Sequence, residues 1–94
     1  MKNNTYRLPE TTTQESLEER WSTVLKYGDY ILLAGHYFMG QGKNSYFGAI
    51  YTFTTEDKTC EGQIKQEKIS TEMYADNGSA IAWCIQNAHY YSGN

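Results

Sequence analysis

The chain has 94 residues, and its eight Lys and Arg residues against eleven Asp and Glu residues give a formal net charge of −3 at pH 7. This length allows one domain with one hydrophobic core, covering residues 1–94, and the negative charge argues against direct binding of nucleic acid. The sequence shows neither a leader peptide nor a run long enough to span a membrane, so we expect a cytoplasmic protein, in the host cell cytoplasm if a phage encodes it.

The first part of the chain divides into a polar arm and a predicted helix. Residues 1–11 are polar and contain the only proline, which is typical of an extended arm. A capping box begins at Thr12, and apolar side chains then recur at helical spacing. This pattern predicts a helix over Gln14–Tyr27 that ends at Gly28. The apolar stripe of this helix consists of Leu17, Trp21, Val24 and Leu25.

Two strongly apolar segments follow the predicted helix. They predict β-strands over Asp29–Phe38 and Ser45–Thr55, joined by a loop at residues 39–44 with two glycines. Both segments have apolar residues at alternate and at intervening positions. Such strands are either central in a sheet or covered on both faces.

A polar strand and a second helix complete the predicted elements. The segment Gly62–Ile69 is rich in charged and amide side chains, which favours an edge strand. The second helix is expected to begin after Asn77–Gly78, with Asn77 or Ser79 as its cap. Its apolar stripe consists of Ile81, Cys84, Ile85 and Ala88.

These elements predict an α+β fold. We expect an N-terminal helix, an antiparallel meander of three or four strands and a C-terminal helix, with both helices packed on one face of the sheet. Trp21 and Ile85 would then pack between the helices. The opposite face of the sheet would display aromatic residues, since the chain has nine tyrosines.

The sequence carries no catalytic or metal-binding pattern. The two cysteines and two histidines are ligand types for zinc, but they lack the paired spacing of zinc sites, so we expect no metal and no cofactor. The cysteines should be reduced thiols in the cytoplasm. His36 is a candidate general base, although a hydrogen-bonded, half-buried histidine is favoured because no acid or nucleophile is identifiable beside it. We therefore expect a protein that is not an enzyme.

The remaining candidate is a surface for binding another protein. Tyrosine combines a large apolar ring with one polar group, and such residues concentrate the energy of interfaces. The loop between the two apolar strands and the tyrosines near it are the first candidates, and the acidic face of the first helix is the alternative. The predicted contact residues are Lys43, Asn44, Tyr46, Tyr37 and Tyr51 in the strand region, and Glu15, Glu18 and Glu19 on the helix.

The leading functional hypothesis is a small protein-binding or inhibitor module that occupies the surface of a larger protein, such as a nucleic-acid-processing complex. In size and composition the chain is similar to phage or mobile-element proteins that inhibit host defence enzymes such as CRISPR effectors, and this resemblance implies an anti-CRISPR-like role. The alternative is a small-ligand binder or sequestering oligomer for a nucleotide or metabolite. A hydrolase using His36 ranks last, and a homodimer stays open.

Overall fold

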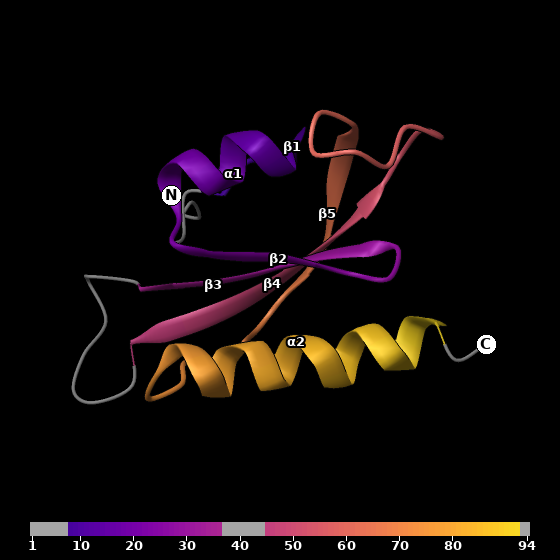
Figure 1. Ribbon diagram of the computed structural model, residues 1–94. Helices are drawn as coiled ribbons and strands as arrows, with labels where there is room; N and C mark the ends of the chain where they lie inside the picture. The colour runs from indigo at the N-terminus through magenta and orange to yellow at the C-terminus, as the bar shows by residue number, and fades with distance from the viewer. Residues whose placement is uncertain (1–7, 37–44, 93–94) are drawn as a thin grey trace.

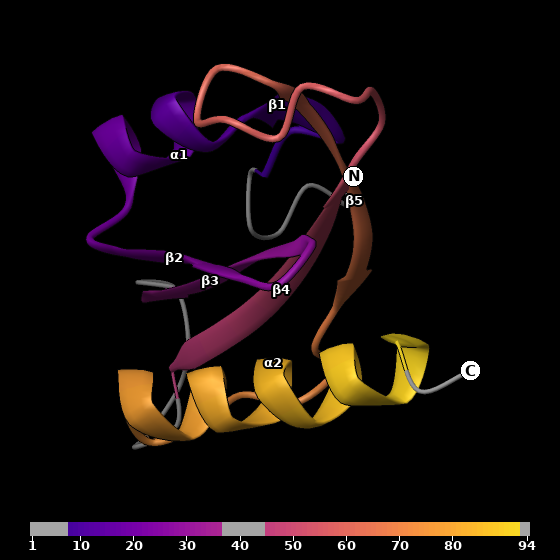
Figure 2. The same cartoon turned by 45° about the vertical axis from the view of Figure 1, so that its right-hand side comes forward.

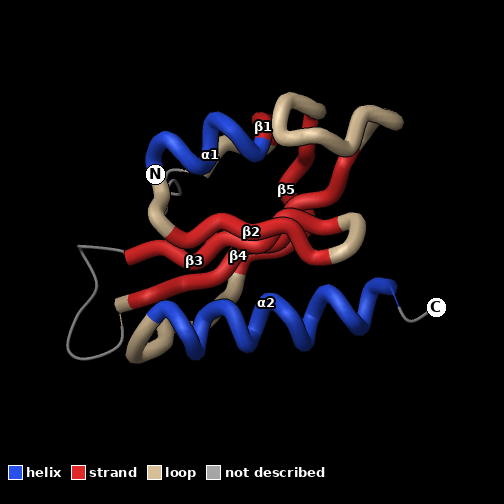
Figure 3. Tube along the Cα trace, in the orientation of Figure 1, coloured by secondary structure: helices blue, strands red, loops and turns tan. Residues whose placement is uncertain are grey.

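The computed structural model describes residues 8–36 and 45–92 of the chain. Within these ranges five strands form one sheet and two helices pack against it (Figures 1 and 3). In chain order the elements are β1 (Thr11–Thr13), α1 (Gln14–Arg20), β2 (Thr23–Tyr27), β3 (Tyr30–His36), β4 (Tyr46–Phe53), β5 (Gln63–Ile69) and α2 (Asn77–Ser92).

The sheet is antiparallel throughout and curls into a half-barrel. Its strand order is β1-β5-β4-β3-β2, so both edge strands come from the beginning of the chain. α1 connects these two edges directly and lies across the open, concave side of the sheet (Figures 1 and 2). α2 lies on the opposite, convex side, where it packs on β3 and β4.

The strongly apolar strands β3 and β4 supply side chains to two separate clusters, one on each face of the sheet. Burial on both faces explains why their sequences lack a clean alternation of apolar and polar residues. The cluster on the α1 side contains the buried residues Leu17, Ile31, Leu33, Phe47, Ala49, Tyr51 and Ile64. The cluster on the α2 side contains the buried residues Leu32, Ile50, Cys84 and Ala88.

The predicted meander with both helices on one face is therefore wrong. Each helix covers its own face, because β3 and β4 expose apolar side chains in both directions. Trp21 and Ile85 belong to different clusters and do not pack together. The expected open aromatic face is absent from the described sheet, where Phe47 and Tyr51 are fully buried.

The predicted helix Gln14–Tyr27 is wrong in its second half, which forms β2. There the side chains alternate between the faces: Val24 packs on the α1 side, and Leu25 packs on the α2 side. This two-residue period lets the segment pair with β3 instead of continuing the helix. Gly28 does not end a helix. It occupies the two-residue turn between β2 and β3, with a positive φ of 61° that glycine adopts without strain.

The predicted arm, residues 1–11, is also part of the sheet where it is described. β1 pairs with β5, so β5 is an interior strand and not the predicted edge. The carbonyl of Pro9 accepts a hydrogen bond of 2.7 Å from the hydroxyl of Tyr51. The N-cap of α1 is Thr13 and not the predicted Thr12, since its hydroxyl accepts from the backbone N–H of Ser16. Residues 1–7 lie outside the described ranges.

The predicted apolar stripe of α2 is confirmed. Cys84 and Ala88 are buried against the sheet, and the two isoleucines of the stripe are half-buried beside them. The predicted caps are wrong, because the carboxylate of Asp76 accepts a hydrogen bond of 2.8 Å from the backbone N–H of Ser79. Asp76 thus satisfies one of the N–H groups that a helix start leaves without an internal partner.

The loop between β4 and β5, residues 54–62, closes the half-barrel at one end. Lys58 forms a salt bridge of 3.2 Å with Asp29 in the β2–β3 turn. The backbone carbonyl of Cys60 accepts a hydrogen bond of 3.0 Å from the N–H of Glu15 in α1. One loop therefore contacts both the crossing helix and the turn beside the far edge strand.

Candidate functional site

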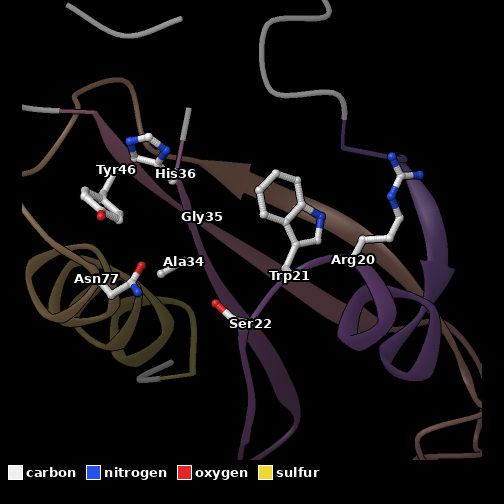
Figure 4. A pocket seen from close by; sticks show the side chains of 8 residues that line it. All are labelled: Arg20, Trp21, Ser22, Ala34, Gly35, His36, Tyr46 and Asn77. Carbon is white, nitrogen blue, oxygen red and sulfur yellow. The ribbon is translucent and has the colours of Figure 1, made fainter. Parts of the chain in front are cut away.

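A cleft of about 420 Å³ lies at the end of the sheet where β3 extends beyond β2. β2 begins at Thr23, which pairs with Ala34, whereas β3 continues to His36. The volume is in the range of small-molecule sites, roughly 300–1,000 Å³. The end of α1, the ends of β3 and β4 and the start of α2 meet here (Figure 4). The lining residues are Arg20, Trp21, Ser22, Ala34, Gly35, His36, Tyr46 and Asn77.

Trp21 provides one aromatic wall of the cleft, and its place is fixed by packing. Its ring meets the ring of Phe47 edge to face, with centroids 5.5 Å apart and planes at 87°. It also lies directly on the backbone of Gly35, where an added Cβ would be 2.5 Å from the indole. The absence of a side chain at Gly35 is therefore what allows Trp21 to occupy this position.

His36 and Tyr46 form a second aromatic group, across the β3–β4 pair. Their ring centroids are 4.9 Å apart and their planes are tilted by 54°. The backbone of Tyr46 is held by an isolated bridge to Tyr74, with reciprocal N–H to carbonyl hydrogen bonds of 3.0 and 2.7 Å. These contacts fix the backbone beside the cleft before any ligand enters.

Further polar groups of the cleft come from the end of α1, the residues just after it and the start of α2. Arg20 carries the only formal charge among the eight lining residues, and Ser22 and Asn77 add a hydroxyl and an amide. Hydrogen bonds from the backbone N–H and the hydroxyl of Ser79 lower the pKa of Asp76, so the carboxylate that caps α2 stays ionised. Aromatic rings and an amide around one hollow can stack on a flat ring and bind its polar edge, and an arginine at the rim can bind an attached anion.

Comparison with family models places the chain in a known family. Residues 8–88 match the family model described as nucleotide modification associated domain 4, or Nmad4. The chain belongs to this family. Neither the curated proteins nor the solved structures include a match to the chain. Membership in Nmad4 ties the chain to nucleotide modification systems, and the match covers every lining residue of the cleft.

The contact residues that the sequence predicts for this Nmad4 domain lie in different environments in the structure. Tyr46 lies in the cleft, and His36 lies beside it. Tyr51 has no exposed surface to offer a partner, because its ring is buried in the core. Burial also raises the pKa of its hydroxyl. The acidic residues of α1, which are Glu15, Glu18 and Glu19, are exposed. Tyr37, Lys43 and Asn44 lie outside the described residues.

Sequence reasoning missed six of the eight lining residues, including the three with the largest polar or aromatic side chains. Trp21 was expected to be a helix core residue, and Arg20 and Asn77 carried no signal of a site. They line one cleft only because α1 crosses to the far edge of the sheet and ends at the same end of the sheet as the start of α2, on the opposite face. The dipeptide Gly28–Asp29 between two tyrosines was the available signal, since it is typical of a two-residue hairpin turn and would have placed a strand directly after Trp21.

The described residues contain no group of three or more His, Cys, Asp or Glu side chains that could hold a metal ion. In the same residues, neither helix has the length and apolar character to cross a membrane. Both cysteines are free in the structure, with Cys60 exposed and Cys84 buried.

Proposed function

We propose that this Nmad4 domain binds a nucleotide as a small ligand in the cleft and serves a nucleotide modification system as a binding module, not as an enzyme. The observation that carries the proposal is that the side chains of Trp21, His36, Tyr46 and Asn77 line one hollow of about 420 Å³, with Arg20 at its rim. These are the groups that recognise a base and a phosphate together.

Each group has a role that its chemistry suits. The rings of Trp21, His36 and Tyr46 offer stacking surfaces to the base, and the amide of Asn77 can both donate to and accept from its polar edge. The guanidinium of Arg20 points away from the other lining side chains in Figure 4, and a change of rotamer toward the hollow would let it pair with the phosphate through two parallel hydrogen bonds. A single nucleotide also suits a chain of net charge −3 better than a long polyanion does.

Binding without chemistry is favoured by the composition of the lining. Among the described residues, the lining contains one histidine but neither a carboxylate nor a thiol, which are common partners of a histidine in acid–base and nucleophilic catalysis.

The proposal is tested by tryptophan fluorescence. The chain has two tryptophans, so Trp83→Phe leaves Trp21 in the cleft as the only reporter. We expect nucleoside 5′-monophosphates to quench this emission to saturation, with a panel covering the ribo- and deoxyribonucleotides and 5-methyl and 5-hydroxymethyl deoxycytidylate. Tyr46→Ala should weaken binding by about 1–3 kcal/mol, the usual value of one stacking contact.

The matched control compares two cations. Arg20→Ala should weaken the binding of monophosphates more than that of nucleosides, whereas Lys65→Ala, at an exposed position in β5, should change neither. If no member of the panel changes the emission of Trp21 in the folded protein, the cleft does not bind nucleotides.

A second proposal is the protein-binding or inhibitor function, in which the domain covers part of a larger protein of a nucleic-acid-processing complex, as anti-CRISPR proteins do. The exposed glutamates of α1 support it, because Glu15, Glu18 and Glu19 present negative charge from one short helix. Affinity purification with Glu18→Lys and Tyr46→Ala distinguishes the two proposals. Loss of a captured partner in Glu18→Lys alone would favour the acidic helix over the cleft.

A further inference from the structure

We propose that the domain forms a two-fold symmetric dimer in which the outer edge of β2 pairs with β2 of a second copy. This inference does not depend on nucleotide binding, because it rests on the backbone and the charges of the edge strand.

The two edges of the sheet differ in how they are protected. β1 has three residues, and short edge strands resist pairing with other chains. β2 has five residues and contains no proline. In Figure 1 it lies between α1 above and α2 below, and neither helix crosses its outer edge.

The charged side chain of β2 that could prevent pairing at this edge, that of Lys26, is held in contacts elsewhere in the molecule. Lys26 is the only charged residue in β2. Its Nζ donates a hydrogen bond of 3.2 Å to the carbonyl of Lys58 and lies 5.7 Å from the ring centroid of Phe53. An outward-projecting lysine is a common device against edge pairing, and here that lysine is held against the β4–β5 loop and β4.

The backbone of β2 has the right spacing to pair with itself. Tyr27 pairs with Tyr30 across the two-residue turn, so alternate residues of β2 bond to β3, and Val24 and Lys26 direct their N–H and C=O groups outward. An antiparallel copy centred on Leu25 sets Val24 of each chain opposite Lys26 of the other. The backbone N–H and C=O groups of each Val24–Lys26 pair can then form hydrogen bonds between the chains, and the two-fold axis relates one pair to the other.

The same register is complementary in charge. It places the β2–β3 turn of the second copy opposite Trp21 and Ser22, beside the cation of Arg20. Asp29 in that turn has a side chain that is 74% exposed, even with Lys58 at 3.2 Å. Each copy therefore brings a carboxylate toward the arginine of the other, and the attraction occurs twice in the dimer.

The expected dimer is weak and concentration-dependent, since pairing over five residues buries less than the roughly 1,200–2,000 Å² of a standard stable interface. Light scattering across a concentration series should show a shift from monomer to dimer. Lys26→Pro should abolish this shift, because proline removes an outward N–H without removing a bond to β3. Lys26→Ala, which loses the same side chain, should keep it.

Circular dichroism confirms that both variants are folded. A native protein that stays monomeric over the series, or a folded Lys26→Pro protein that dimerises as Lys26→Ala does, would overturn the proposal.

A cross-linking experiment tests the register. In a Cys60→Ser background, Leu25→Cys should form a disulfide-linked dimer on mild oxidation, because residue 25 faces its own copy across the axis. Lys26→Cys is the control, since its two copies would be diagonal neighbours about 7–8 Å apart, too far for a disulfide. Cross-linking through residue 26 instead, or at neither position, would contradict the pairing.

Discussion

The missing side chain at Gly35 determines where the indole of Trp21 can lie. A Cβ at this position would be 2.5 Å from Trp21 and 2.9 Å from Phe47. We expect Gly35→Ala to displace the indole and to lower the free energy of unfolding by about 1–3 kcal/mol, as overpacking does. In the Trp83→Phe background, the emission of Trp21 should shift to longer wavelength and nucleotide binding should weaken.

Gly48 provides the control for this prediction. A Cβ there would also be crowded, at 2.9 Å from the carbonyl of Ala80 and from the thiol of Cys84, but on the α2 side of the sheet. Gly48→Ala should therefore destabilise the fold while leaving the emission of Trp21 unchanged. Equal emission shifts in both variants would mean that Gly35 does not position the indole.

The two cysteines should differ sharply in reactivity. Burial raises the pKa of the Cys84 thiol to about 12, so almost none of it is thiolate near neutral pH, whereas Cys60 is exposed. Maleimide labelling of the native protein followed by mass spectrometry should add one label, at Cys60. A second label should appear only after denaturation, and rapid labelling of Cys84 in the folded protein would contradict the packing of α2.

At the scale of elements, α1 is too short to be stable alone. A helix of seven residues is marginal in water, so packing of its apolar side must hold it. Leu17, which is 1% exposed, is the buried residue of this helix. We expect Leu17→Ala to lower the free energy of unfolding by about 2–5 kcal/mol.

Urea denaturation measures this loss, and Glu19→Ala, at an exposed position of the same helix, should change stability by less than about 0.5 kcal/mol. Similar losses in both variants would show that Leu17 does not anchor α1 in the half-barrel.

The elements also show what the sequence could and could not predict. The centres of β3, β4, β5 and α2 follow from local patterns: β3 and β4 are long apolar runs, β5 is a polar segment after a turn, and the apolar residues of α2 repeat at the helical period. β2 was assigned to a helix because Leu17, Trp21 and Val24 fit the helical period although they span a helix and a strand. β1 has three threonines and no apolar pattern, so only its pairing with β5 defines it.

The cleft was predictable only in part, because most of its residues are brought together by the topology and not by a local sequence pattern. Tyr46 was identified because tyrosines beside loops favour contacts, but Arg20 and Asn77 are unremarkable in the sequence. They line one cleft through the crossing of α1, which is a property of the topology and not of any local segment.

At the scale of the whole molecule, the β4–β5 loop holds the half-barrel closed at one end. Gly62 is tightly enclosed in this loop, where a Cβ would overlap the backbone carbonyl of Asp57. We expect Gly62→Ala to lower the free energy of unfolding by about 1–3 kcal/mol. Thermal unfolding of the full chain measures the change.

Gly78 is the matched control for Gly62. A Cβ there would meet only the carboxylate of Asp76, at an ordinary distance of 3.5 Å, in the first turn of α2. Gly78→Ala should raise stability by up to about 1 kcal/mol, because alanine favours the helix. A stabilised Gly62→Ala protein would show that the loop does not constrain the sheet.

The crossing of α1 from one edge of the sheet to the other also determines when the protein can fold during its synthesis. Thr11 leaves the ribosome well before its partner Lys65, because the whole of α1, β2, β3 and β4 lies between them in the sequence. The growing chain can build the hairpin of β2 and β3 early, but β1 has nothing to pair with until β5 emerges. Contacts between such distant segments slow folding, since a long loop must close before they form. We therefore expect the domain to reach its native state only after β5 has emerged, in a step that joins β1 to β5.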